Sequence, residues 1–146
     1  MKILAQRVTD ASVRVGDRTV GSIARGLVIY LGVHVDDTEK DAEFLANKVV
    51  NLRVFEDSEG KMNLSALQLK LELLVISQFT LYADTEKGYR PSFTTAMKPE
   101  GARALYEKFI EICRRSGLKV ETGEFRADMR IASTNDGPVS IIIESR

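Results

Sequence analysis

The sequence predicts an α/β fold made of one compact domain over residues 1–146, in which a curled, barrel-like mixed sheet of about eight strands packs with two helices. Three observations lead to this prediction. Alternating or continuously apolar segments of strand length recur along the chain, two segments repeat apolar residues at helical spacing, and no Pro-, Gly- or Ser-rich stretch interrupts them. A length of 146 residues suits one domain, and 44% hydrophobic residues are enough for a core.

The first third of the chain is predicted to be strands. The segments at residues 2–8, 12–15 and 19–24 are short, and a turn at residues 16–18 separates the last two. Residues 26–33 form a continuous apolar run, which is typical of a strand that is buried on both faces.

The first predicted helix begins at Thr38. Asp41 stands three residues later, where its carboxylate can reach back in an imperfect capping box. Apolar residues then repeat at helical spacing from residue 42 to residue 49 and form the buried stripe. Negative charge at a helix start complements the helix dipole, which favours capping over metal binding for the acidic residues here, namely Asp36, Asp37, Asp41 and Glu43.

The second half of the chain is predicted to complete the sheet around a second helix. Strands at residues 52–55 and 71–77 precede a long aperiodic loop at residues 83–98, and loops of that length are more often functional than idle. The helix begins at about Pro99 and ends near Gly117, which suits a C-cap. The remaining predicted strands are residues 118–122, 130–132 and 139–143.

The charge and the residue inventory exclude several classes of protein. The 21 Lys and Arg balance 21 Asp and Glu, so no polybasic coat for bulk nucleic acid is expected, whereas a small site for one end of an RNA stays open. The single cysteine, Cys113, excludes an internal disulfide, and the single histidine, His34, excludes a multi-histidine metal site. We expect no metal and no other cofactor. Charged residues interrupt the apolar residues near the N-terminus, which argues against a signal peptide, and the apolar runs are too short for a membrane span. We therefore expect a cytoplasmic protein with no membrane partner.

A polar segment at the end of the strongly apolar strand 71–77 is a candidate site. Ser77, Gln78 and Thr80 follow a run of core residues, and strand alternation predicts Ser77 and Phe79 on one side with Gln78 and Thr80 on the other. Buried polar groups destabilise a fold unless they are paired, so polarity here indicates a partner or a ligand. A strand that simply leaves the core for solvent is the alternative.

The segment Asn135-Asp136-Gly137-Pro138-Val139 is a second candidate. Its turn chemistry predicts a reversal between two strands, because Asn, Asp and Gly tolerate positive φ. Pro138 then opens the final strand, where its missing N–H does least harm. Sequence physics alone does not decide whether the Gly137–Pro138 bond is cis.

Together these two segments, Ser-Gln-Phe-Thr-Leu at 77–81 and Asn-Asp-Gly-Pro-Val at 135–139, closely resemble the two signature motifs of the D-aminoacyl-tRNA deacylase family. The resemblance covers essentially the whole chain and includes Gly-Tyr-Arg-Pro-Ser-Phe at 88–93. Three positions depart from it. Ser140 stands where the family usually has Thr, Arg126 where it commonly has Gly, and Ala132-Ser133-Thr134 where an apolar Leu is usual before the turn.

The resemblance implies a hydrolase that cleaves the ester between a D-amino acid and the 3′ end of tRNA, which recycles tRNA and enforces homochirality. It also implies a homodimer in which Gly137 and a cis Pro138 of one subunit enter the other subunit's site as a gate that rejects L-aminoacyl-tRNA. Arg7 would brace this gate. No DNA partner is expected.

The resemblance further places Ser77, Gln78, Phe79 and Thr80 around the scissile ester, with main-chain N–H groups polarising its carbonyl. Phe125 and Met129 would help to shape the pocket for the terminal adenosine, and Ala102 would contribute main-chain recognition. Two nucleophiles stay open: the Thr80 hydroxyl, and a water assisted by the 2′-OH of the tRNA. No His, Lys or acidic residue lies between Leu73 and Ala83, so the water is favoured.

Two other classes of function stay open. One is a general esterase that acts on other aminoacyl carriers. The other is a non-catalytic dimeric module that binds an RNA end or associates with DNA, because fold and motif alone never prove an activity. The preferred D-amino acids and tRNAs are not predicted.

Overall fold

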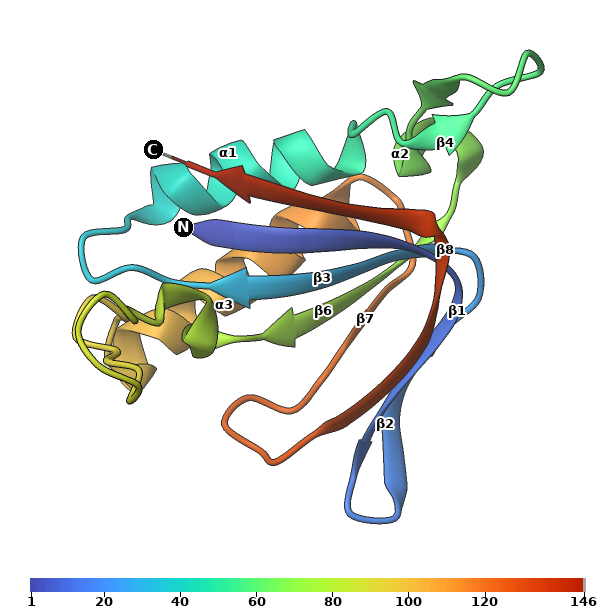
Figure 1. Ribbon diagram of the computed structural model, residues 1–146. Coiled ribbons are helices and arrows are strands. Elements are labelled where there is room, and N and C mark those ends of the chain that lie inside the picture. The colour runs from blue at the N-terminus through green and yellow to red at the C-terminus, as the bar shows by residue number, and fades with distance from the viewer. Residues whose placement is uncertain (146) are drawn as a thin grey trace.

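The computed structural model, which describes residues 1–145, is organised around its first strand, β1 (Lys2–Val15). β8 (Arg130–Glu144) pairs antiparallel with β1 along nearly its whole length. On the other edge of β1, β3 (Gly26–Gly32) pairs with the first half of the strand and β2 (Arg18–Ile23) pairs with the second half. The two-stranded ribbon of β1 and β8 therefore changes neighbours midway, and it bends there (Figure 1).

The next two strands of the sheet run parallel to β3. β6 (Glu72–Ser77) pairs with β3, and β7 (Val120–Thr122) pairs with β6. The strand order is β2-β1-β3-β6-β7, with β8 beside β1. This arrangement confirms the predicted curled, barrel-like mixed sheet. A separate small sheet is formed by β4 (Phe55–Glu56) and β5 (Met62–Leu64).

Apolar residues form two clusters on the two faces of the sheet. The helices α1 (Glu39–Val50) and α3 (Pro99–Arg115) cover one face, and Leu45, Phe109 and Cys113 are fully buried there (Figure 1). Burial raises the pKa of the Cys113 thiol to about 12, so this thiol is protonated and unreactive at neutral pH. The opposite face holds a smaller cluster around Val28 and Ile76.

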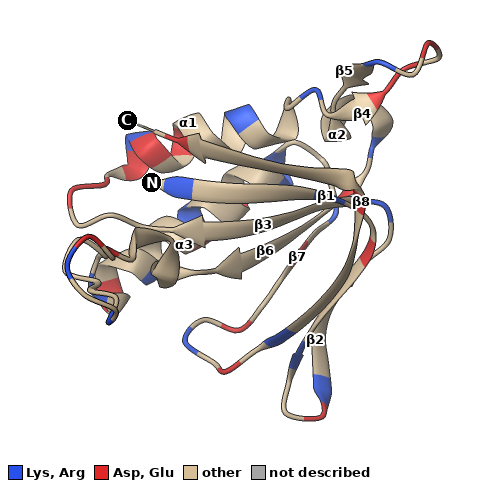
Figure 2. Cartoon of the chain, in the orientation of Figure 1, with Lys and Arg blue, Asp and Glu red and all other residues tan. Residues whose placement is uncertain are grey.

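None of the helices in the described part of the chain combines the length and the apolarity that a membrane crossing requires. Basic and acidic residues are mixed along the helices, strands and loops, in keeping with the neutral net charge (Figure 2).

The structure corrects two predicted strand breaks. The segments at residues 2–8 and 12–15 are one strand, because the polar residues between them continue the ladder, with Asp10 opposite Thr134. The segments at residues 130–132 and 139–143 are also one strand, β8, so the predicted reversal at residues 135–138 is wrong. Turn-forming residues here make a bulge within a continuous strand.

Three further differences lie between residues 52 and 69. The predicted strand at residues 52–55 is reduced to β4, and neither β5 nor the short helix α2 (Ala66–Leu69) was predicted. The signal for α2 is a capping box. The Ser65 hydroxyl accepts from the Gln68 N–H at 3.2 Å, and the Gln68 side chain accepts from the Ser65 N–H at 2.9 Å.

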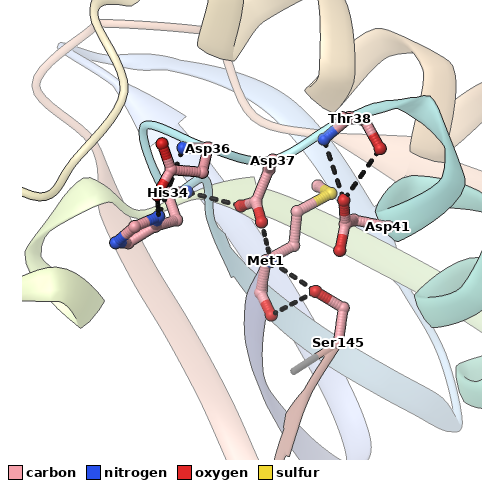
Figure 3. A network of polar contacts seen from close by, with 7 residues as sticks. All are labelled: Met1, His34, Asp36, Asp37, Thr38, Asp41 and Ser145. Carbon is pink, nitrogen blue, oxygen red and sulfur yellow. Dashed lines mark hydrogen bonds and ion pairs between the residues drawn. The ribbon is translucent and has the colours of Figure 1, made fainter.

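A buried charge network ties the outer end of the β1–β8 ribbon to the start of α1 (Figure 3). The Met1 ammonium donates to Asp37 Oδ1 at 2.5 Å and to Ser145 Oγ at 2.6 Å, and neither the Met1 nor the Asp37 side chain is exposed. The second Asp37 oxygen accepts from the His34 N–H at 2.5 Å. At the helix start, the Thr38 N–H donates to the Asp41 carboxylate at 2.8 Å, as the predicted capping box requires.

Because its cationic partner is buried with it, Asp37 is expected to be a strong determinant of stability. Asp37→Asn should lower the free energy of unfolding by about 3–5 kcal/mol, since it removes the carboxylate that is hydrogen-bonded to the buried ammonium. The matched control is Asp36→Asn, whose side chain is 70% exposed and should cost less than about 1 kcal/mol. Urea unfolding of both variants measures the difference, and equal losses would contradict a special role for the buried pair.

Candidate functional site

The polar segment after β6 leaves the sheet. β6 ends at Ser77, the Gln78 N–H donates to the Leu31 carbonyl at 2.8 Å, and a 3₁₀ helix, η1 (Phe79–Tyr82), follows. The predicted strand alternation over residues 77–80 is therefore wrong, because the strand ladder stops at Ser77 opposite Leu31. The polar residues lie instead at the carboxyl end of a central parallel strand, a position where open α/β sheets place ligand sites.

An open pocket of about 660 Å³ lies at this strand end. Its walls come from β3, from the segment after β6, from the end of the long loop at residues 83–98, from the start of α3 and from the loop between β7 and β8. Six of the ten site residues predicted from the sequence line it together: Ser77, Gln78, Phe79, Ala102, Phe125 and Met129. Its volume lies within the range of small-molecule sites.

Thr80 does not line the pocket, and its side chain is exposed. Its hydroxyl accepts a short hydrogen bond from the Gln78 side-chain amide, which is the only side-chain hydrogen bond of Thr80 within residues 1–145. An amide N–H donor cannot remove a proton from the hydroxyl. Within residues 1–145, Thr80 therefore has no hydrogen-bonded base to activate it.

The backbone of η1 offers two free donors beside the pocket. Within the described chain, the N–H groups of Phe79 and Thr80 have no hydrogen-bond acceptor, as is usual for the first residues of a helix. Leu81 N–H, by contrast, donates to the Gln78 carbonyl at 3.3 Å.

Aromatic contacts hold two walls of the pocket. Phe79 packs edge-to-face against Phe93 of the long loop, with ring centroids 5.0 Å apart. Across the pocket, Phe125 contacts Tyr106 of α3, with centroids 5.7 Å apart. The predicted loop at residues 83–98 is confirmed as a segment without helix or strand, and Met97 N–H ties its end to the Val33 carbonyl at 2.9 Å.

Tyr106 is a pocket residue that sequence reasoning missed. Its hydroxyl donates to the Val75 carbonyl of β6 at 2.9 Å, and burial raises its pKa well above the usual value, so the hydroxyl stays protonated as a donor. The available signal was a tyrosine on the apolar stripe of α3, because a buried tyrosine hydroxyl needs a partner.

The Gly137–Pro138 segment lies elsewhere, in a bulge of β8. Gln6 pairs with Ser140 and Val8 with Asn135, so the single residue Arg7 faces residues 136–139. The Gly137–Pro138 bond is cis, as the family resemblance implied. Neither residue lines the pocket of its own chain.

Arg7 and Asn135 fix the shape of this bulge. Arg7 is 6% exposed; its Nε donates to the Asp136 carbonyl at 3.0 Å and its Nη1 to the Val54 carbonyl at 2.7 Å. The Asn135 side chain accepts from the Val139 N–H at 3.0 Å and donates to the Ser140 hydroxyl at 3.1 Å. Ser140 thus supplies the hydroxyl that this contact requires.

His34 and the acidic residues do not form a second site. The His34 ring accepts the Asp36 N–H at 3.2 Å and packs at 5.3 Å from the Tyr82 ring. No group of three or more His, Cys, Asp or Glu side chains within residues 1–145 is arranged to hold a metal ion.

Comparison with known proteins assigns the chain to a family. Residues 4–144 match the family model described as D-Tyr-tRNA(Tyr) deacylase, and the chain belongs to that family. It is 55% identical over 145 residues to the D-aminoacyl-tRNA deacylase of Thermotoga petrophila. The matched region covers 99% of this chain and 97% of that protein. It is 56% identical to the D-aminoacyl-tRNA deacylase of Dehalococcoides mccartyi, over 100% of this chain and 95% of that one.

Two solved structures have the same fold. One is described as the c-Myc DNA unwinding element binding protein; its TM-score is 0.93 at 43% identity, and the match covers 100% of this chain and 99% of that chain. The other is described as a probable eukaryotic D-amino acid tRNA deacylase, with a TM-score of 0.86 at 16% identity over 98% of both chains.

Gly137 is predicted to be the least replaceable residue of the bulge. Its φ is +131°, and a Cβ there would lie 2.9 Å from Val139 Cγ2 and 3.1 Å from Arg7 Nη2. Gly137→Ala should therefore lower the free energy of unfolding by about 1–3 kcal/mol. Gly60→Ala is the matched control, because Gly60 also has a positive φ of +74° but open space around its Cβ position. An equal loss in both variants, measured by urea unfolding, would show that crowding at Gly137 is unimportant.

Proposed function

We propose that this protein hydrolyses the ester bond between a D-amino acid and the 3′ end of tRNA. The observation that carries the proposal is the match over almost the whole chain, at 55–56% identity, with proteins that are named for this activity. The reaction returns a free tRNA and a free D-amino acid, so its role is proofreading. A neutral protein suits a substrate of which only the aminoacylated end is held.

The pocket beside η1 is proposed to bind the terminal adenosine with its ester. The apolar side chains of Phe125 and Met129 offer contact area to a base, and Ala102 leaves room at the start of α3. The ester then lies against residues 77–79, at the strand end.

The chemistry proposed for this site relies on main-chain groups. The Phe79 and Thr80 N–H groups have no acceptor in the described chain, so they are available to stabilise the negative charge that develops on the ester carbonyl oxygen. The attacking group is a water molecule, assisted by the 2′-OH of the terminal ribose. The absence of a base beside the Thr80 hydroxyl supports water over threonine as the nucleophile.

The gate is proposed to come from the partner subunit of a homodimer. Gly137 and Pro138 lie outside the pocket of their own chain, in a bulge held by Arg7, so a second copy is needed to place them over a substrate. Backbone carbonyls in such a gate accept the ammonium of a D-amino acid, whereas the side chain of an L-amino acid would collide with them. Backbone cannot change rotamer, which makes the rejection steric.

The direct test of the proposal is to follow ester hydrolysis in matched D- and L-aminoacyl-tRNA. Hydrolysis of the D-form alone is expected. Comparable hydrolysis of free D-amino-acid esters would favour a general esterase. The similarity to a protein described as binding a DNA unwinding element gives a second candidate, a DNA-associated module, which would bind duplex DNA and leave both aminoacyl-tRNAs intact.

Thr80→Ala is expected to keep substantial activity, with kcat lowered by no more than about tenfold, because the main-chain donors survive the substitution. Single-turnover hydrolysis of D-tyrosyl-tRNA is the measurement. A drop of about a thousandfold, or roughly 4 kcal/mol of transition-state stabilisation, would instead make the hydroxyl a nucleophile or a proton carrier.

Subunit mixing tests the cross-subunit gate. Gly137→Ala damages the gate, and Ala102→Trp fills the pocket, so each homodimer should be inactive. Heterodimers purified through two different tags should regain about half of the wild-type activity, because one of their two sites combines an intact pocket with an intact gate. Inactive heterodimers would place gate and pocket in the same subunit, and a failure to recover any doubly tagged protein would contradict the dimer.

A further inference from the structure

The turn between β7 and β8 holds an arginine in a conformation that favours glycine. Ala127 N–H donates to the Glu124 carbonyl at 3.1 Å, which closes a four-residue turn, and Arg126 at its third position has a φ of +67°. A positive φ at this position alone is the pattern of a type II turn, for which glycine is the preferred residue. Arginine there is unfavourable for the backbone.

Within positions 1–145, only one other residue that is not glycine has a positive φ, and its position at the end of a helix explains that conformation. Lys70, with a φ of +52°, ends α2, and its N–H donates to the carbonyls of Ala66 and Leu67. Left-handed residues are common at that position of a helix. Arg126 ends no helix, so the local structure gives no reason for an arginine.

The Arg126 side chain is a free cation at the rim of the pocket. Arg126 lines the pocket and is exposed, and no carboxylate of the described residues lies within 4 Å of its guanidinium. The neighbouring Glu124 is bound to Arg18 at 2.9 Å. The loop between β7 and β8 carries both signs of charge (Figure 2). Asp128 also lines the pocket, and within the described residues it forms no ion pair with Arg126.

We propose that Arg126 binds a backbone phosphate of the RNA, next to the terminal nucleoside. This inference rests on the proposed function. When the terminal nucleoside occupies the pocket, the chain that leaves it must cross the rim, and the first group along that chain is a phosphate. A guanidinium binds phosphate through two parallel N–H donors. Lys98, which lines the pocket from the start of α3 and has no ion pair in the described chain, adds a second positive charge there.

The proposal predicts a selective defect in Arg126→Gly. KM for D-tyrosyl-tRNA should rise about tenfold with kcat unchanged, because a contact to a non-reacting phosphate is lost. KM for D-tyrosyl-adenosine, which has the ester and the nucleoside but no phosphate, should stay at the wild-type value. The dependence of log(kcat/KM) on log[salt] for the tRNA substrate should become shallower by about 0.7. The melting temperature should not fall, since glycine suits the turn.

Two controls make the result specific. Lys70→Gly makes the same change at the other left-handed cationic residue, which does not line the pocket, and should leave both KM values unchanged. Arg126→Lys keeps the charge and should recover part of the affinity for tRNA.

Three outcomes would overturn the proposal. Wild-type kinetics in Arg126→Gly would show that the guanidinium makes no contact. An equal rise in KM for both substrates would show that Arg126 shapes the pocket rather than binding phosphate. Failure of the wild-type protein to hydrolyse either substrate would contradict the proposed function itself, and with it this inference, whereas the first two outcomes leave the proposed function standing.

Discussion

The hydrogen bonds made by the buried guanidinium of Arg7 are the interactions on which the rest of the architecture depends. A charge that is 6% exposed is tolerated only when its donors are satisfied, and here the carbonyls of Asp136 and Val54 accept from it. Glu56 and the Asp136 side chain lie 3.9 and 3.5 Å away and contribute negative charge. One side chain of β1 thus joins the bulge of β8 to the segment before β4.

Arg7 also lies close to the boundary between the two halves of the sheet. β1 pairs with β3 up to Val8 and with β2 from Ala11 onward, whereas β8 pairs with β1 along its other edge. This change of neighbours lies next to the bulge at residues 136–139, and the ribbon bends there (Figure 1). Bulges increase local twist and bend a strand, so the feature that presents Gly137 and Pro138 at the surface also curls the sheet.

Sequence periodicity predicted the core elements and the fold class, because the apolar runs at residues 26–33 and 71–77 and the stripe of α1 record burial directly. It failed where local chemistry is ambiguous. Asn135 to Pro138 carry the residues of a turn, but Arg7, 129 positions before Asp136 in the chain, makes them a bulge within a strand. Likewise, nothing local at Ser77 shows that the ladder stops there, since that depends on where β3 ends. The pocket residues came from motif resemblance, whereas Tyr106 belongs to no quoted motif and was missed.

The pairing of β1 with β8 has a consequence for how the protein is made. A ribosome releases β1 first, and no strand of the described sheet is synthesised after β8. Until β8 emerges, β1 presents a bare edge and the guanidinium of Arg7 lacks the Asp136 carbonyl. The sheet therefore closes only after β8 has been translated, and until then the exposed edge of the nascent chain makes this fold most open to aggregation and to chaperone binding.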